Sequence, residues 1–219
     1  MKKIIKRIVY FLFPPLKHYH RFMKSQSNAV SFNQWLAYWL KNNKKLYWPV
    51  HKNSEVTHPN NIFVGINSNA GTRPGCYIQG NGGVWIGNYV HFASNIGVIS
   101  GNHGLYDHMK HENKEVRIED YCWIGMNVVI MPGVHLGPRT VVGAGSVVTK
   151  SFSDGYCVIG GNPAKLIKEL DKEKFMPTKY EEEYYGFVPK AKFAKFAEKH
   201  LKDNRYFDTI RNNDAIQKK

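Results

Sequence analysis

Residues 122–150 read CWIGMNVVIMPGVHLGPRTVVGAGSVVTK, and the apolar residues of this stretch recur every six positions. The recurring aliphatic residues are Ile124, Ile130, Leu136, Val142 and Val148. A second series of apolar or small residues, offset by four positions, contains Val128, Val134, Thr140 and Ser146. A period of six matches neither the 3.6 of an α-helix nor the 2 of a half-buried strand. Hexapeptide periodicity is typical of a parallel β-helix, in which each unit supplies one short strand and one turn.

The same period extends upstream to Ile62 and fades downstream at Leu166. It is interrupted once, because the spacing from Val98 to Ile118 is 20 residues and is not a multiple of six. The interruption predicts an extended loop at 104–117, whose polar and charged sequence suits an exposed segment. The sequence therefore predicts an all-β solenoid, a parallel β-helix of about five coils.

The flanks of the solenoid lack the period of six and predict helical segments. We expect three regions: a basic and aromatic arm with a helix at 1–61, the β-helix at 62–170, and a helical extension at 171–219. In the first region one helical face, with Ser31 and Gln34 as a capping box, would cover the open end of the column. That face holds Trp35, Leu36, Trp39 and Leu40.

A second amphipathic helix is predicted at 190–201. Its inward residues would be Phe193, Phe196 and Ala197, and we expect this face to pack on a neighbouring subunit.

The chain has 219 residues, 42% of them hydrophobic, which indicates a folded protein. Its formal net charge of +14 favours an anionic partner, but the charge is dispersed and no nucleic-acid-binding motif is present. Three cysteines without disulfide-like spacing suggest a reducing compartment. The apolar part of MKKIIKRIVYFLF at 1–13 is too short for a signal-peptide core. We therefore expect a cytoplasmic protein, with residues 1–16 as a candidate for peripheral membrane contact.

Three stretches together resemble the hexapeptide-repeat acyltransferases: IGNYVHFASNIGVISGNH at 86–103, the stretch at 122–150, and VIGGNPAKLIKEL at 158–170. The resemblance is strongest to the maltose and galactoside O-acetyltransferases and to the bacterial polysaccharide O-acetyltransferases. It implies a left-handed β-helix, a homotrimer with active sites between subunits, acetyl-CoA as donor and no required metal. The implied reaction is transfer of an acetyl group to a sugar hydroxyl, as in the synthesis of surface polysaccharide.

The resemblance assigns His103, which opens the loop, as the general base. A hydroxyl acceptor needs such a base, and histidine ionises near neutral pH. Asp107 is the candidate that orients the second ring nitrogen of His103. Glu112, Glu115 or a backbone carbonyl remain alternatives for that role.

The resemblance implies that coenzyme A is held near the C-terminal end of the β-helix, at positions that match those of the family. Trp123 and Gly125 match the pantetheine channel. The other matching positions are Ala144, Thr149, Lys150, Lys165 and Lys168. On the acceptor side, Arg73 and Asn81 stand where sugar enzymes carry Asn and Asp. This departure weighs against maltose or a simple galactoside as substrate, whereas Arg73 suits an acidic sugar or a phosphate.

Three other functions remain open. One is an O-acetyltransferase of the streptogramin and chloramphenicol type. Another is a metalloenzyme similar to the γ-class carbonic anhydrases, with Zn²⁺ on His91, His103 and His108. The third is a β-helix scaffold without catalysis. The stretches GAGSVVTK at 143–150 and GNPAK at 161–165 favour a coenzyme A enzyme over the last two.

Overall fold

The computed structural model describes residues 9–13, 16–17, 19–20, 23, 31–32, 35, 46–178 and 180–216, the last four of these by their backbone alone. The helical face predicted around Trp35 lies mostly outside these residues. Trp35 itself is buried and packs with Tyr184. Among the described helices, none combines the length and apolar character needed to cross a bilayer.

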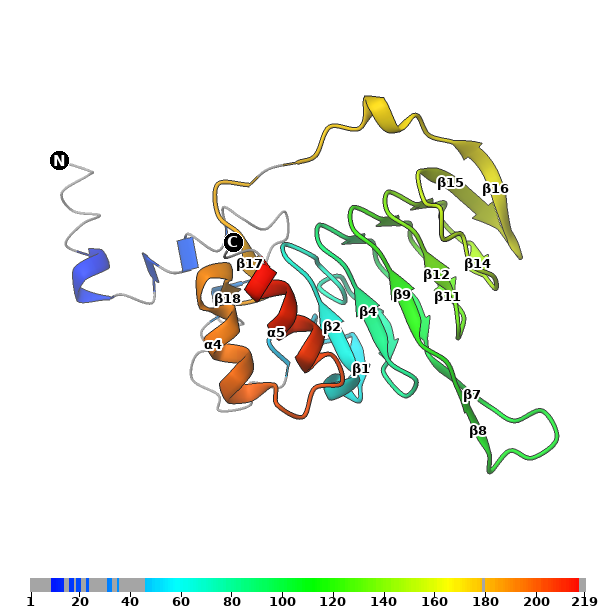
Figure 1. The fold of residues 1–219 in the computed structure, drawn as a ribbon, viewed down its shortest axis with the longest axis horizontal. Coiled ribbons are helices and arrows are strands. Elements are labelled where there is room, and N and C mark those ends of the chain that lie inside the picture. Colours follow the sequence, from blue (N-terminus) through cyan, green and yellow to red (C-terminus); the bar gives the residue numbers. More distant parts are fainter. Residues whose placement is uncertain are drawn as a thin grey trace.

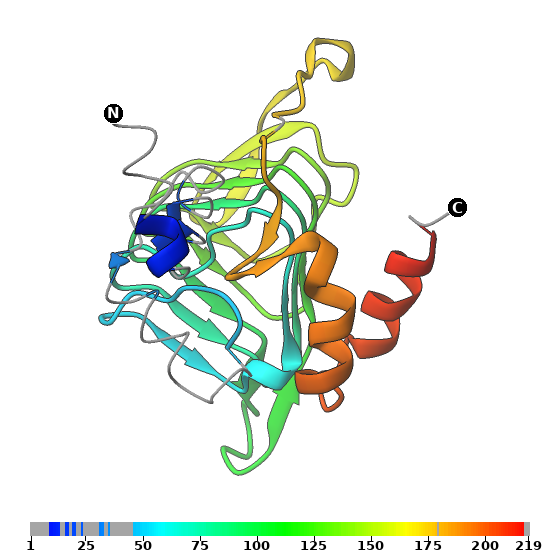
Figure 2. The same cartoon turned by 90° about the vertical axis from the view of Figure 1, so that its left-hand side faces the viewer.

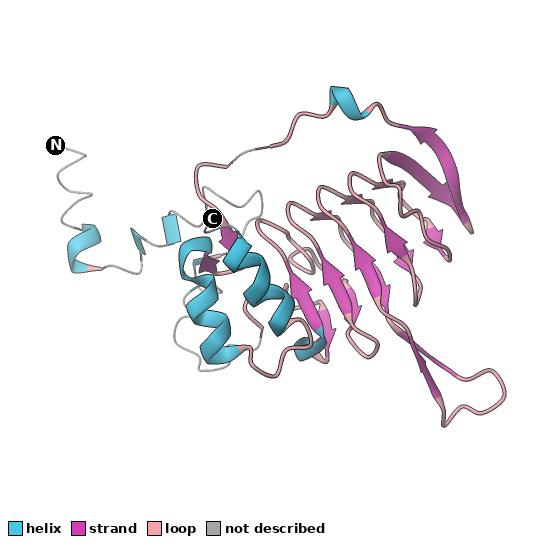
Figure 3. Cartoon of the chain, viewed as in Figure 1, coloured by secondary structure: helices cyan, strands magenta, loops and turns pink. Residues whose placement is uncertain are grey.

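Three sheets of short parallel strands form the sides of a prism (Figures 1 and 3). Face 1 consists of β1 (Glu55–Thr57), β3 (Tyr77–Gln79), β6 (Gly97–Ile99), β11 (Val129–Ile130) and β14 (Val147–Val148). Face 2 consists of β2 (Ile62–Val64), β4 (Val84–Ile86), β9 (Val116–Ile118) and β12 (His135–Leu136). Face 3 consists of β5 (His91–Phe92), β10 (Trp123–Ile124), β13 (Val141–Val142), β15 (Cys157–Gly161) and the antiparallel β16 (Ala164–Glu169). From β3 onward the chain visits faces 1, 2 and 3 in turn, so the sheets are the sides of a parallel β-helix.

The period of six corresponds to the inward positions of successive strands. On face 1, Ile78, Val98, Ile130 and Val148 pair in register, and each has no exposed surface. On face 3, Phe92, Ile124 and Val142 also pair in register, and each is buried. Stacked coils thus bury a continuous aliphatic column, as in other solenoids. Not every position that this count reaches is buried. Pro74, twelve residues after Ile62, is exposed at a corner, and Asn102, four residues after Val98, is exposed beyond β6.

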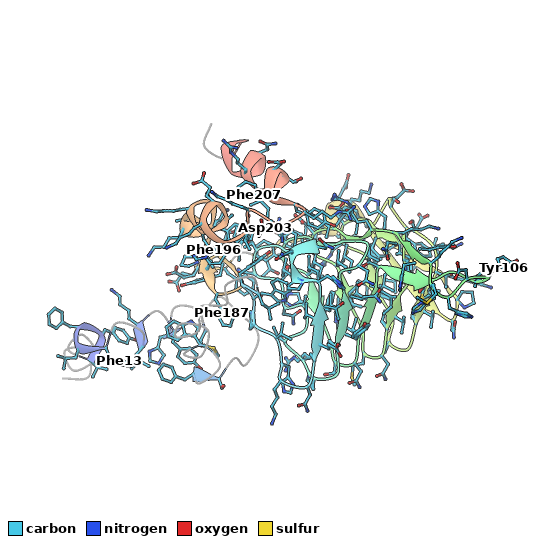
Figure 4. The ribbon with its side chains drawn as sticks, turned by 90° about the horizontal axis from the view of Figure 1, so that it is seen from below. Phe13, Tyr106, Phe187, Phe196, Asp203 and Phe207 are labelled. Atoms are coloured by element: carbon cyan, nitrogen blue, oxygen red, sulfur yellow. The ribbon has the colours of Figure 1, made fainter. Side chains whose placement is uncertain are left out.

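The predicted loop is a two-stranded hairpin at the corner between faces 1 and 2. Strand β7 (Gly101–His103) pairs antiparallel with β8 (His111–Asn113), and the tip holds the fully exposed Tyr106. Figure 4 shows Tyr106 at the end of the molecule opposite Phe187 and Phe196. The expected loop at 104–117 is shifted in the structure, because His103 already pairs within the hairpin and Val116 has rejoined face 2.

The first coil is covered by the C-terminal part of the chain (Figures 1 and 2). After the 3-10 turn η2 (Lys172–Lys174), the hairpin of β17 (Tyr184–Tyr185) and β18 (Val188–Pro189) leads into α4 (Lys190–His200) and α5 (Phe207–Ile216). The turn η1 (Pro59–Asn61) precedes β2. Helix α4 was expected to pack on a neighbouring subunit. Instead, Phe193 stacks on Tyr185 of its own chain with ring centroids 3.8 Å apart, because residues 171–189 return the chain to the first coil.

Residues 170–178 and 180–183, here called the strap, run back along the corner between faces 2 and 3. Five residues with positive φ mark this corner, one in each coil, and we call them the corner column: Asn67, Tyr89, Tyr121, Arg139 and Tyr156. Bulky residues seldom adopt positive φ, because Cβ then crowds the backbone. The strap packs Phe175 against Tyr121 and Arg139, and Tyr180 against Tyr89. The aromatic residues of the strap thus pack on residues whose backbone has the unfavourable positive φ.

Candidate active site

His103 ends strand β7, and its imidazole is held by the hairpin itself. The Nδ1 atom of His103 lies 2.8 Å from the carbonyl oxygen of His108. Because a carbonyl can only accept a hydrogen bond, Nδ1 must carry the hydrogen and donate it. The other nitrogen, Nε2, then keeps a free lone pair in the neutral ring. The side chain is exposed, and its ring faces that of His111 at 4.6 Å between centroids.

Asp107 does not orient His103, contrary to the prediction. Its carboxylate accepts a hydrogen bond from the backbone N–H of Met109 at 3.0 Å and lies 3.7 Å from the Lys110 ammonium group. Both partners are within three residues, so Asp107 stabilises the turn of the hairpin. A backbone carbonyl, one of the alternatives left open, occupies the orienting position instead.

The base of the hairpin is fixed to the preceding coil by buried polar contacts that the sequence did not reveal. The hydroxyl of Ser100 accepts from the N–H of Gly82 at 2.9 Å and donates to the carbonyl of Gln79. The Gln79 side chain accepts from the N–H of Gly101 at 2.9 Å. These contacts join β7 rigidly to the column, so His103 projects from a fixed platform rather than from a mobile loop.

The corner between faces 1 and 2 gathers several of the predicted site residues. Asn81 lies one coil before the hairpin, and a Cβ at Gly101 would come within 3.1 Å of the Cβ of Asn81. Thr149 and Lys150 are exposed just after β14, on the same corner in a later coil. His103, Asn81, Thr149 and Lys150 therefore follow one edge of face 1.

The remaining predicted coenzyme A residues lie on face 3 and on its corner with face 1. Trp123 is 60% exposed on β10. Gly125 follows it in the turn, where a Cβ would lie 2.7 Å from the nitrogen of Ala144 in the next coil. Lys165 and Lys168 are exposed on β16. Within one chain, face 1 separates this group from His103.

Arg73 and Asn81, the predicted acceptor residues, are also on different corners. Arg73 borders a cavity of about 610 Å³ on the outer side of face 3. His91 lines the same cavity, and partial burial holds the pKa of its imidazole below the usual value. The strap contributes Thr178 to the rim. Of the residues that line this cavity, the sequence had singled out Arg73, His91 and Trp123, each for a different role.

The three histidines of the metalloenzyme alternative are not brought together in the chain. His91 lines the cavity on face 3, whereas the ring of His103 contacts the hairpin. Over the part of the chain that the structure describes, no group of three His, Cys, Asp or Glu side chains is placed to hold a metal ion.

Comparison with known proteins connects this scaffold to acetyltransferases. Residues 115–150 match the family described as bacterial transferase hexapeptide (six repeats). The galactoside O-acetyltransferase of Lactococcus lactis subsp. lactis (strain IL1403) is 32% identical over 96 residues, which are 42% of this chain and 46% of that protein. The chain spans about half the length of the first curated relatives that it matches.

Two solved structures share the fold. A galactoside acetyltransferase in complex with coenzyme A has a TM-score of 0.52 at 24% identity, covering 75% of this chain and 85% of that chain. A hexapeptide-repeat-containing acetyltransferase from Vibrio cholerae O1 biovar eltor, complexed with acetyl coenzyme A, has a TM-score of 0.52 at 24% identity, covering 64% and 85%. The β-helix described above therefore carries a bacterial transferase hexapeptide repeat and resembles solved hexapeptide-repeat acetyltransferases.

Proposed function

We propose that this protein is an acetyl-CoA-dependent O-acetyltransferase that acts on a sugar hydroxyl in the synthesis of surface polysaccharide. The observation that carries the proposal is the hydrogen bond from Nδ1 of His103 to the carbonyl of His108. It leaves Nε2 as a proton acceptor on a scaffold similar to those of known acetyltransferases. The left-handed sense of the coil is part of the proposal.

The chemistry assigns one proton transfer in each direction to His103. Nε2 removes the proton of the acceptor hydroxyl as its oxygen attacks the carbonyl carbon of the thioester. The tetrahedral intermediate collapses by breaking the carbon–sulfur bond, and the imidazolium returns the proton to the departing thiolate. General base catalysis of this kind accelerates a reaction by roughly 10²–10⁴-fold.

The donor would lie along the corner between faces 3 and 1. Trp123 and the backbone at Gly125 and Ala144 would line its pantetheine arm. Lys165 and Lys168 would meet its phosphates as point charges, and Lys150, which lies on the other edge of face 1, would do so from a neighbouring copy. Support comes from the exposure of the three lysines and from the lack of any carboxylate paired with them in the described residues.

A homotrimer would complete the site. His103 and Lys150 lie along one edge of face 1, whereas Trp123 and Ala144 lie along or beyond the other edge. A neighbouring copy that presents its hairpin to the far corner would bring a base and a donor channel together. The site would then lie between subunits and require no metal.

The decisive experiment is transfer from acetyl-CoA, followed by release of free thiol and by mass spectrometry of the acceptor. The panel contains neutral sugars, acidic sugars, chloramphenicol and a streptogramin. We expect one added acetyl group on a saccharide and none on either drug. Transfer to a drug alone would favour the xenobiotic alternative. If none of the acceptors in the panel leads to release of free thiol, the proposed function is contradicted.

A further inference from the structure

The cavity on face 3 has the composition of a binding site for an anionic ligand. It is an open groove of about 610 Å³ whose lining includes Arg73, His91, Tyr121, Trp123 and Arg139. No Asp or Glu is among its lining residues. Pockets of this volume commonly hold small molecules, which a few converging polar groups keep in place.

The polar groups of this groove have hydrogen-bonding capacity to spare. Over the described residues, neither Arg73 nor Arg139 has an acidic side chain within ion-pair distance. The guanidinium carbon of Arg139 lies over the ring of Phe175, 4.4 Å from its centroid. This stacking restrains the group without using its five N–H donors. The half-buried ring of His91 likewise has no hydrogen-bond partner in the part of the chain that the structure describes.

The walls of the groove are aromatic and are held in place by the strap. Tyr89 and Tyr121 stack with ring centroids 4.9 Å apart and planes inclined by 9°. Tyr180 of the strap stacks on the outer side of Tyr89, and Phe175 packs edge-on against Tyr121. Trp123 stands 60% exposed beside them. A fixed aromatic surface presents a flat apolar platform, which suits the C–H faces of a sugar ring.

We propose that this groove binds the acceptor, and that the acceptor is a saccharide bearing a carboxylate or phosphate group. The sugar ring would pack on Tyr121 and Trp123, and its anionic group would pair with Arg139 and Arg73. An arginine pairs with either anion through two parallel N–H bonds, which gives orientation as well as affinity. The inference rests on the proposed function, and it adds the chemical class of the acceptor and the residues that select it.

The position of the groove relates it to the donor channel. Trp123 borders both the groove and the corner that carries Gly125 and Ala144. Lys165 and Lys168, the proposed phosphate contacts, lie on β16, beyond the last coil. An acceptor in the groove would therefore meet the thioester end of the donor rather than its phosphates.

Binding can be tested without acetyl transfer, by calorimetry on the full chain. The probes are an oligogalacturonate, glucose 1-phosphate and maltotetraose, which offer a carboxylate, a phosphate and no charge. We expect one of the anionic probes to bind at least about tenfold more tightly than maltotetraose. Arg139→Gln and Arg73→Gln should weaken that probe about tenfold or more, Arg139→Lys should recover part of the loss, and Arg211→Gln on α5 should change nothing.

Each possible failure has a separate meaning. Equal affinity for neutral and anionic probes, no binding of either anionic probe, or unchanged affinity in Arg139→Gln would overturn the inference. Competition between coenzyme A and the anionic probe would also overturn it, because the groove would then belong to the donor. His103→Ala should keep full binding of the anionic probe while it loses transfer activity. If the wild type binds the probe but transfers no acetyl group, the proposed function is contradicted and the groove remains an anionic-saccharide site.

Discussion

The hydroxyl of Tyr89 donates a 2.5 Å hydrogen bond to the carboxylate of Glu183, a residue 94 positions later in the chain. The same carboxylate accepts a bond from the Lys190 ammonium group at 2.7 Å. Burial alone would raise the pKa of Glu183, but the bonds from Lys190 and Tyr89 outweigh it and hold this pKa below its usual value. A coil, the end of the strap and the start of α4 therefore meet at one carboxylate.

Glu183→Gln should destabilise the protein by about 1 kcal/mol at pH 7, since the site is partly exposed and charge-assisted bonds there are screened. A carboxylate with a depressed folded-state pKa contributes stability above its unfolded-state pKa and loses it as pH falls through the folded-state value. The difference between wild type and variant should therefore shrink below about pH 4. Urea denaturation from pH 7 down to about pH 3 measures it, with Glu173→Gln as an exposed control on the strap. A difference independent of pH would contradict the assignment.

His103→Ala should fold normally, because the side chain is exposed, and should lose at least about 10²-fold in kcat. His108→Ala should lose much less, since the group that holds His103 is the backbone carbonyl of His108. His111→Ala should also lose much less. Steady-state thiol release with a working acceptor measures all three variants, and near-normal kcat in His103→Ala would exclude the proposed base.

Lys150→Ala and Lys165→Ala should each raise the KM for acetyl-CoA and leave the acceptor KM nearly unchanged. Lysines that contact phosphates far from the reacting carbon bind the ground state and the transition state about equally, so their loss should change kcat little. Lys199→Ala, on the outer surface of α4, serves as the matched control. Unaltered KM for acetyl-CoA in both variants would show that the donor lies elsewhere.

Gly125→Ala should cost about 1–3 kcal/mol of folding free energy, because the new methyl group would lie 2.7 Å from the backbone nitrogen of Ala144. Gly143→Ala, at the equivalent turn one coil later, meets nothing closer than 3.5 Å and should be nearly neutral. Thermal unfolding of the two variants compares them directly. Equal destabilisation would mean that contact between adjacent coils does not determine the glycine at 125.

The N-terminal arm should bind anionic vesicles. Phe11 and Leu12 are 84% and 73% exposed, and four basic residues lie within the first seven positions of the sequence. Wild type should float with vesicles of anionic lipid, whereas Phe11→Ser combined with Leu12→Ser should float less. A variant lacking residues 1–16 that floats as well as wild type would favour packing of the arm on the oligomer.

The sequence predicted the column well because burial on a solenoid repeats with the coil. Every sixth residue from Ile118 to Val148 is buried, so the inward positions could be counted without a structure. The same logic located the hairpin approximately, since an insert must break the count. It could not place the hairpin strands, because pairing between β7 and β8 depends on backbone register rather than on apolar spacing.

The strap and the groove were not predicted, for a different reason. Tyr89, Tyr121 and Arg139 fall outside the periodic series, and their partners Phe175 and Tyr180 lie far along the chain. Nothing local in the sequence signals such contacts. The assignment of Asp107 failed similarly: a carboxylate near a histidine in sequence can be used by the turn itself, as it is here.

In a simple solenoid each repeat contacts only its neighbours, so the stack behaves as an open linear array whose ends fray independently. The strap changes this connectivity. It leaves the last coil at Leu170, whose N–H bonds to the carbonyl of Tyr156, and it reaches the first coil where Asn67 and Tyr184 exchange hydrogen bonds. The strap thereby connects the last coil of the array directly to the first coil. Opening the last coil loosens contacts made at the first, so the two ends of the stack share one cooperative unit.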